Sequence, residues 1–188
     1  MSFPTRSRSA SSRLLPWVFV LLAALPFAAH AFGETFYVSF VARMLIYALA
    51  ATALNLALGY GGLVSFGHAL FLGIGAYAVG LPSFHGIDSG VWHLVLALAA
   101  TGVVAWITGI ISLRTSGIAF IMITLAFAQM GYYFFVSLKQ YGGDDGLSLQ
   151  SVSRFGSWRL DSPEIVYGVA FVTLLLVTWW MARLRQAP

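Results

Sequence analysis

Cysteine is absent from the 188 residues, and charged side chains are scarce. The missing cysteines exclude a disulfide framework, a cysteine-based zinc site and a thiol nucleophile. Only 9% of the residues are charged and 60% are hydrophobic, whereas a soluble domain carries about 25% charged residues. A chain of this size has too little interior to bury that much apolar surface. The composition therefore excludes a disordered chain, a coiled coil and an ordinary cytosolic enzyme, and it leaves an integral membrane protein.

Motifs for catalysis and nucleotide binding are also missing from the sequence. It contains no G-x-x-x-x-G-K-[ST] phosphate loop, no H-E-x-x-H metal helix and no recognisable pairing of a nucleophile with a base. We therefore expect no enzyme activity, no cofactor and no metal site. The net charge is +4, but Lys139 is the one lysine and the arginines sit mostly at the edges of apolar runs. This distribution indicates membrane topology and no nucleic-acid partner.

Six apolar segments approach or meet the length of about 20 residues that a membrane-spanning helix requires. They are residues 14–32, 36–59, 63–82, 91–113, 117–138 and 165–182. None alternates with a period of two, so helices are favoured over barrel strands. The sequence therefore predicts an all-α integral membrane protein with about six transmembrane helices, some of them broken by glycine.

The arginines predict the orientation of these helices. Six of them fall on the side of both termini, and only three basic residues fall in the long loop 139–164 on the other side. Because basic residues concentrate on the cytoplasmic side, we expect both termini to be cytoplasmic. The expected organisation is a cytoplasmic tail (1–13), a transmembrane domain (14–182) with an external loop (139–164), and a cytoplasmic stub (183–188). Arg43 is expected to snorkel or to meet a neighbouring helix.

The first segment has a second interpretation. Arg6, Arg8 and Arg13 precede an apolar stretch, and Ala29-His30-Ala31 fits a small-x-small cleavage site. These are features of a secretory signal peptide. A retained helix is favoured, and cleavage would leave the later topology unchanged.

The stretch 59–77 is the richest in residues that serve a membrane transport path. Its candidates for a helix break or a translocation path are Gly59, Gly61, Gly62, Ser65, Gly67, His68 and Gly73. Glycines let helices approach closely, and they let a helix break where it lines a cavity. Ser65, Ala69 and Gly73 are four residues apart, which places them on one face of a continuous helix. A tightly packed helix pair with a turn at the glycines is the alternative, with His68 as a hydrogen-bonded packing residue.

Thr124 and Gln129 are polar residues inside an apolar segment, where lipid would leave them without partners. They are expected to face another helix or a pore, and interhelical hydrogen bonding is the simpler role. In the loop, Gly142, Gly143, Asp144, Asp145 and Gly146 predict a tight turn. The two aspartates lack the spacing of a calcium loop. A docking or gating loop is the alternative to a purely structural turn.

These stretches resemble the membrane subunit of branched-chain amino acid ABC importers, specifically the M-type permease of the heterodimeric pair. The first match comprises Asn55-Leu56, Gly59-Tyr60-Gly61-Gly62, Ser65-Phe66-Gly67-His68-Ala69 and Gly73-Ile74-Gly75-Ala76-Tyr77. The second comprises Leu113-Arg114, Gly117-Ile118-Ala119-Phe120 and Thr124-Leu125-Ala126-Phe127-Ala128-Gln129-Met130. The third is Gly142-Gly143-Asp144-Asp145-Gly146-Leu147. Three motifs in this order, across roughly residues 36–185, are specific.

The resemblance implies a role and a set of partners. A periplasmic or extracellular binding protein would deliver a branched-chain or related amino acid, and two permease subunits would form the path in a bacterial cytoplasmic membrane. Two cytoplasmic ATPases would drive alternating access. This chain would then supply half of the path and no chemistry. Relatives in the family resemble importers of urea, amides and other amino acids as well.

Family members continue past the sixth segment into a cytoplasmic coupling loop and further helices, whereas this sequence stops at Pro188. We therefore expect it to be the N-terminal portion of a permease, truncated before the coupling loop. Two other functions stay open: a self-contained channel or secondary carrier, and a non-transporting fragment. The absence of Asp and Glu from the apolar segments counts against an ion-coupled carrier.

Overall fold

The computed structural model describes residues 17–26, 35–149, 151–156 and 158–184. Its main elements are the first helix (Trp17–Pro26), α2 (Thr35–Asn55), a π-helical turn (Leu56–Tyr60), α3 (His68–Phe84), α4 (Gly90–Ser112), α5 (Ile118–Ser137) and α6 (Pro163–Leu184). The prediction of an all-α membrane protein is confirmed. The predicted tail 1–13, the cleavage motif Ala29-His30-Ala31 and residues 185–188 lie outside the described residues.

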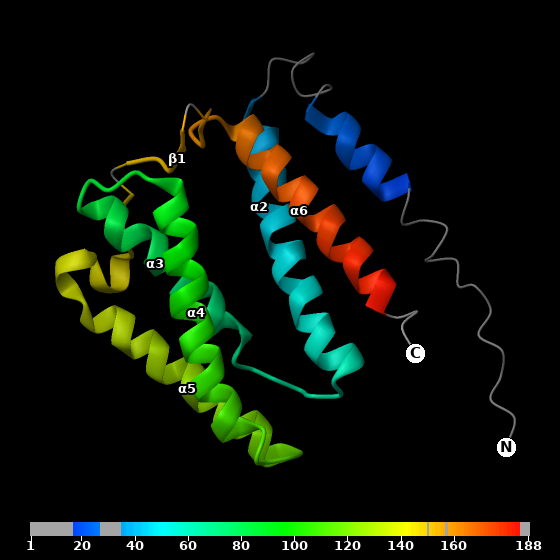
Figure 1. The fold of residues 1–188 in the computed structure, drawn as a ribbon, viewed down its shortest axis with the longest axis vertical. Coiled ribbons are helices and arrows are strands. Elements are labelled where there is room, and N and C mark those ends of the chain that lie inside the picture. Colours follow the sequence, from blue (N-terminus) through cyan, green and yellow to red (C-terminus); the bar gives the residue numbers. More distant parts are fainter. Residues whose placement is uncertain (1–16, 27–34, 150, 157, 185–188) are drawn as a thin grey trace, which may run out of the picture.

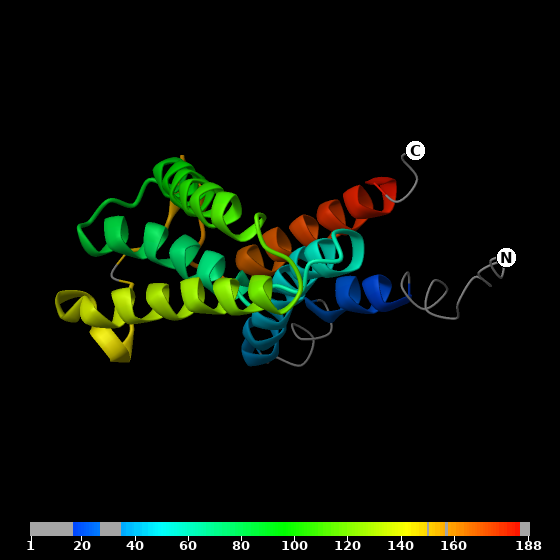
Figure 2. The same ribbon diagram turned by 90° about the horizontal axis from the view of Figure 1, so that it is seen from below.

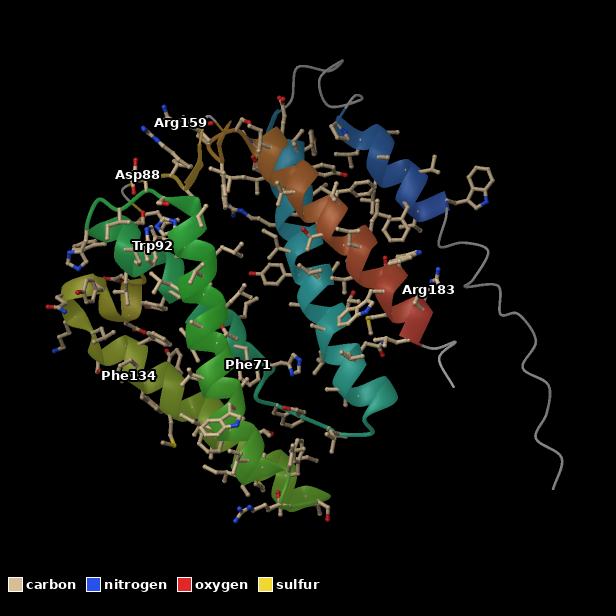
Figure 3. All side chains as sticks on the ribbon, in the orientation of Figure 1. Phe71, Asp88, Trp92, Phe134, Arg159 and Arg183 are labelled. Carbon is tan, nitrogen blue, oxygen red and sulfur yellow. The ribbon has the colours of Figure 1, made fainter. Side chains whose placement is uncertain are left out.

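Four of the helices are long and apolar enough to cross a membrane, with spans at Phe36–Gly59, Gly90–Ser112, Ile118–Ser137 and Pro163–Leu184. Large apolar side chains point away from the protein along them: Trp106 is 69% exposed and Ile118 is 76% exposed. Exposure of this kind is favourable in lipid and costly in water. Asp88 and Arg159 lie at one end of the bundle and Arg183 lies at the other (Figure 3).

The helices form two groups, which Figures 1 and 2 show from two directions. In one group, α2 packs along α6 and the first helix lies against them. Its core is Val38, Ala42, Leu45, Tyr167, Ala170 and Leu174. The Tyr167 hydroxyl donates a hydrogen bond of 2.6 Å to Leu22 O, which ties α6 to the first helix. In the other group, α3 packs against α4 and α5.

Successive helices run in opposite directions. The segment 61–67, the turn between α4 and α5, and the end of α6 therefore lie toward one end of the bundle (Figure 1). The turn before α4 and the loop before α6 lie toward the other end. This alternation is what the sequence predicts for six consecutive spans.

The loop before α6 is folded and fixed to the ends of α3 and α4. It contains two short 3₁₀ turns (Lys139–Tyr141 and Gly143–Asp145) and an antiparallel hairpin of β1 (Arg154–Phe155) and β2 (Trp158–Arg159). The hydroxyl of Ser83, which is 1% exposed, donates to Ser151 O at 2.8 Å. Buried His93 bonds Ser153 Oγ at 2.7 Å and Ile87 O at 2.8 Å. These bonds close the loop over the ends of two helices.

The third helix differs from its predicted bounds. The sequence predicts it from residue 63, but the structure begins α3 at His68 and leaves 61–67 without regular helix. The expectation that Ser65 shares a helix face with Ala69 and Gly73 is therefore wrong, because Ser65 precedes the helix. With 17 residues, α3 is about 25 Å long at 1.5 Å per residue, which is shorter than the hydrocarbon core of about 30 Å.

The core between α2 and α6 gives a test of this packing. Ala42 is 3% exposed, so Ala42→Leu should overpack the interface and lower the free energy of unfolding by about 1–3 kcal/mol. The matched control is Ala126→Leu, because Ala126 is exposed on α5. Unfolding of the detergent-solubilised protein would be followed by circular dichroism. Equal unfolding midpoints for Ala42→Leu and Ala126→Leu would contradict the packing of α2 on α6.

Candidate functional site

The residues that follow α2 end the helix. Its last turn widens into a π-helical turn, in which Gly61 N–H donates to Leu56 O at 3.3 Å. Gly62 then adopts a φ of +61°, which L side chains rarely adopt. A side chain at Gly59 would meet Asn55, and one at Gly61 would meet the backbone of Ala57. The predicted glycines therefore form the turn that ends α2.

The segment after this turn, residues 63–67, is held against α5 by Thr124. Phe66 N–H donates to Thr124 Oγ1 at 3.2 Å, and the same hydroxyl donates to Ile121 O at 3.0 Å. Gly67 lies so close to α5 that a Cβ there would stand 3.1 Å from Thr124 O. Gly67 N–H also bonds Ser65 Oγ at 3.2 Å. The bonds to Thr124 and Ser65 stabilise a non-helical backbone that lipid could not solvate.

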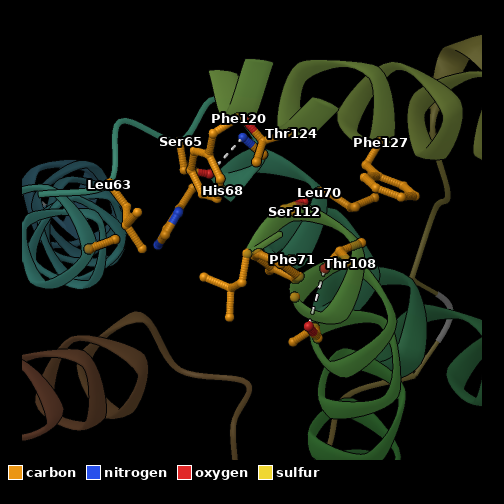
Figure 4. Close-up of a pocket in the computed structure, with 15 residues that line it drawn as sticks. Leu63, Ser65, His68, Leu70, Phe71, Thr108, Ser112, Phe120, Thr124 and Phe127 are labelled. Atoms are coloured by element: carbon orange, nitrogen blue, oxygen red, sulfur yellow. Dashed lines mark hydrogen bonds between the residues drawn. The ribbon is translucent and has the colours of Figure 1, made fainter. Parts of the chain in front are cut away.

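A cavity of about 180 Å³ lies where this segment meets α3, α4 and α5. Figure 4 shows its labelled lining residues around one space. The polar ones are Ser65, His68, Thr108, Ser112 and Thr124, and the walls between them are leucine, phenylalanine, alanine and glycine. The cavity is therefore largely apolar with a few polar groups, as small-molecule sites usually are.

Two polar atoms at this cavity have no hydrogen-bond partner among the residues the structure describes: His68 Nδ1 and Ser112 Oγ. Ser112 is 3% exposed. Thr108, one turn earlier on α4, satisfies its hydroxyl by donating to Val104 O at 2.8 Å. Because buried polar groups are almost always paired, the two unpaired atoms mark a place suited to a polar ligand.

Four of the residues predicted from the sequence come together here: Ser65, Gly67, His68 and Thr124 all line the cavity. Sequence reasoning missed Thr108 and Ser112. Their spacing of four residues on α4 is the signal that could have found them, since it puts both hydroxyls on one helix face.

Two other predicted residues lie elsewhere. Gly73 lines a separate cavity of about 300 Å³ between α3 and α5, and a Cβ built on it would meet no other described part of the protein within 4 Å beyond its own chain neighbours and helix backbone. Gly131 of α5 instead leaves room for the Leu70 side chain of α3, because a Cβ there would overlap the end of that side chain. Gln129 is exposed on α5, about 140° around the axis from Thr124. A direct role for Gly73 or Gln129 in a path stays a prediction.

The predicted loop turn is present as a 3₁₀ turn. Gly142, Gly143 and Gly146 have φ values of 95°, 54° and 83°, which explains the need for glycine. The Tyr132 hydroxyl donates to Asp144 Oδ1 at 3.4 Å, while Asp145 is exposed. Among the described residues, no group of three or more His, Cys, Asp or Glu side chains is placed to hold a metal ion.

Comparison with protein families gives a match that covers most of the chain. The model described as "branched-chain amino acid transport system / permease component" matches residues 36–185. The chain belongs to this family. The match begins at α2 and includes the break, the cavity and the loop before α6. Comparison with curated proteins and with solved structures gave no match.

Membership of the family fixes the general role of the chain. It is a permease component of a transport system and a multi-pass membrane protein. The predicted resemblance to branched-chain amino acid permeases is confirmed. The family indicates a transport subunit rather than an enzyme.

The bond between Phe66 and Thr124 can be tested in the permease. Thr124→Val keeps the shape of the side chain and removes the hydroxyl, so the segment 63–67 should be less stable by about 0.5–1.5 kcal/mol. Hydrogen exchange of the Phe66 amide should then accelerate up to about tenfold. The control is Thr173→Val, because the exposed Thr173 hydroxyl donates within its own helix to Val169 O. An unchanged exchange rate at Phe66 would contradict the role of Thr124.

Proposed function

We propose that the chain is the membrane-spanning subunit of an ATP-binding-cassette importer for branched-chain or related amino acids, and that it forms half of the translocation path. The family match over residues 36–185 is the observation that carries this proposal. The 188 residues contain no phosphate loop, so ATP hydrolysis would belong to separate subunits.

The cavity beside the helix break supports a place on that path. Its volume of about 180 Å³ resembles that of an apolar cavity of about 150 Å³ that holds a benzene molecule, so a branched aliphatic side chain fits by size. His68 Nδ1 and Ser112 Oγ would bond the polar end of the substrate. A site of this kind combines apolar walls with a few polar groups that fix orientation.

The proposal implies a specific assembly. A second permease subunit would complete the path, and two cytoplasmic ATPases would open and close it. A periplasmic or extracellular binding protein would deliver the substrate. The membrane would be the bacterial cytoplasmic membrane, with both chain termini on the cytoplasmic side.

Purification from the native membrane tests the assembly. The tagged chain would be isolated in mild detergent, its partners identified by mass spectrometry, and the assembly reconstituted in vesicles containing ATP. The proposal predicts co-purifying ATPases and a second permease, and ATP-dependent uptake of leucine, isoleucine or valine. Uptake by the chain alone would contradict it in favour of a self-contained carrier. ATP-dependent uptake of urea with none of amino acids would contradict the proposed substrate.

In that reconstituted assembly, His68→Ala should reduce the rate of leucine uptake at least about tenfold, because it removes a polar group from the cavity. Membrane insertion and assembly should be unchanged. His85→Ala is the control, since His85 is exposed at the other end of α3 and bonds Tyr141 Oη at 3.2 Å. A wild-type rate of leucine uptake by the His68→Ala variant would contradict a place for His68 on the path.

A further inference from the structure

Arg43 is a full charge within a spanning helix. It lies seven residues into the span Phe36–Gly59, about 10 Å along the helix axis. The other charged residues of the described helices, Glu164 and Arg183, lie in the first and last turns of α6. A charge at such a depth is costly in lipid, so it usually faces a partner or a hydrated cavity and serves a function.

Arg43 has no ion-pair partner among the residues the structure describes, whereas Arg154 pairs with Asp88 and Arg159 pairs with Asp161. Its exposed side chain lines a groove of about 550 Å³ between α2 and the α3–α4 pair. The groove is otherwise lined by apolar and aromatic residues, with the Tyr47 ring one helical turn from Arg43. The Arg43 guanidinium is thus a charged group on a surface that is otherwise apolar.

The groove adjoins the cavity at the helix break through lining residues that they share with a third opening. Ile46, Phe71 and Leu72 line both this groove and a second cavity of about 420 Å³ further along α2. The second cavity in turn shares His68 and Phe71 with the site cavity. Figure 3 shows Phe71 on the side of its helix group that faces α2. Three adjoining openings therefore lie between Arg43 and Ser112, and Phe71 lines each of them.

We propose that Arg43 is a specificity-determining residue of this path: its guanidinium binds the carboxylate of the transported amino acid while the apolar groove receives the aliphatic side chain. Guanidinium binds carboxylate through paired, charge-assisted hydrogen bonds. The inference rests on the proposed function and narrows it, because it selects substrates that carry a carboxylate over neutral urea and amides. The amino and carboxylate groups of an α-amino acid are attached to the same carbon, so one substrate molecule would not span from Arg43 to Ser112. Arg43 and Ser112 would therefore contact the substrate at successive positions along the path.

The first test is uptake kinetics in the complete reconstituted assembly. Arg43→Gln should raise the KM for leucine about ten- to hundredfold, and Arg43→Lys should raise it less because it keeps the charge. Leucinamide, which lacks the carboxylate, should compete poorly with leucine in the wild type and about equally well in Arg43→Gln. Arg183→Gln is the matched control, since Arg183 lies at the end of α6 with its guanidinium 5.5 Å from the Trp179 ring centroid. The KM of the Arg183→Gln variant for leucine should be unchanged.

The second test uses the absence of native cysteine from this chain. Arg43→Cys would be treated, in the assembled transporter, with a thiosulfonate reagent that adds an aminoethyl group or with one that adds a sulfonatoethyl group. The positive group should restore leucine uptake and the negative group should not, and leucine should slow both reactions. The wild-type assembly is treated in parallel to account for cysteines in other subunits.

The outcomes separate the inference from the function on which it rests. If the wild-type assembly takes up no amino acid, the proposed function fails and the inference fails with it. If leucine uptake is normal in the wild type and Arg43→Gln has the same KM, the inference alone is overturned. It is also overturned if Arg43→Gln prevents assembly and Arg43→Lys restores it with no change in KM, because Arg43 would then pair with an acidic side chain of a neighbouring helix.

Discussion

The hydrogen bond from Phe66 N–H to Thr124 Oγ1 is the contact on which the site depends. It fixes the non-helical segment 63–67 to α5, and that segment forms one wall of the cavity that holds His68 and Ser112. Without this bond the chain between Gly62 and His68 would have few internal partners. The close approach of Gly67 to Thr124 shows that the same contact favours a residue without a side chain, because a Cβ at residue 67 would crowd Thr124.

The membrane explains why a break of this kind is rare and placed where it is. Backbone amides in lipid must be bonded within the protein, which restricts irregular backbone to places that protein or a hydrated cavity encloses. Here α3, α4 and α5 enclose the break on one side, and a second cavity between α2 and α3 adjoins it on the other. A largely apolar cavity with a few polar groups, an interrupted helix and an arginine within a spanning helix therefore lie near one another in this permease.

Hydropathy predicted the helices well because membrane insertion depends chiefly on the length of apolar runs. It failed at residues 63–67, where the sequence stays largely apolar while the φ of Gly62 and the tertiary bond to Thr124 prevent a helix. His68 and Thr124 were predictable as polar groups in apolar runs. Ser112 is also a polar residue in an apolar run, but it lies two residues before Arg114, near the end of the predicted helix, where a hydroxyl is expected. Its burial depends on how α3, α4 and α5 pack, which local sequence does not encode.

The central claim is that the cavity beside the break lies on the substrate path. The most direct measurement is the rate at which a thiol reagent labels Ser112→Cys in the assembled transporter, with and without leucine, since this chain has no other cysteine. The account predicts that leucine slows labelling at Ser112→Cys and leaves labelling at an exposed control, Ala126→Cys, unchanged. Equal rates with and without saturating leucine at Ser112→Cys, in an assembly that transports leucine, would contradict the account.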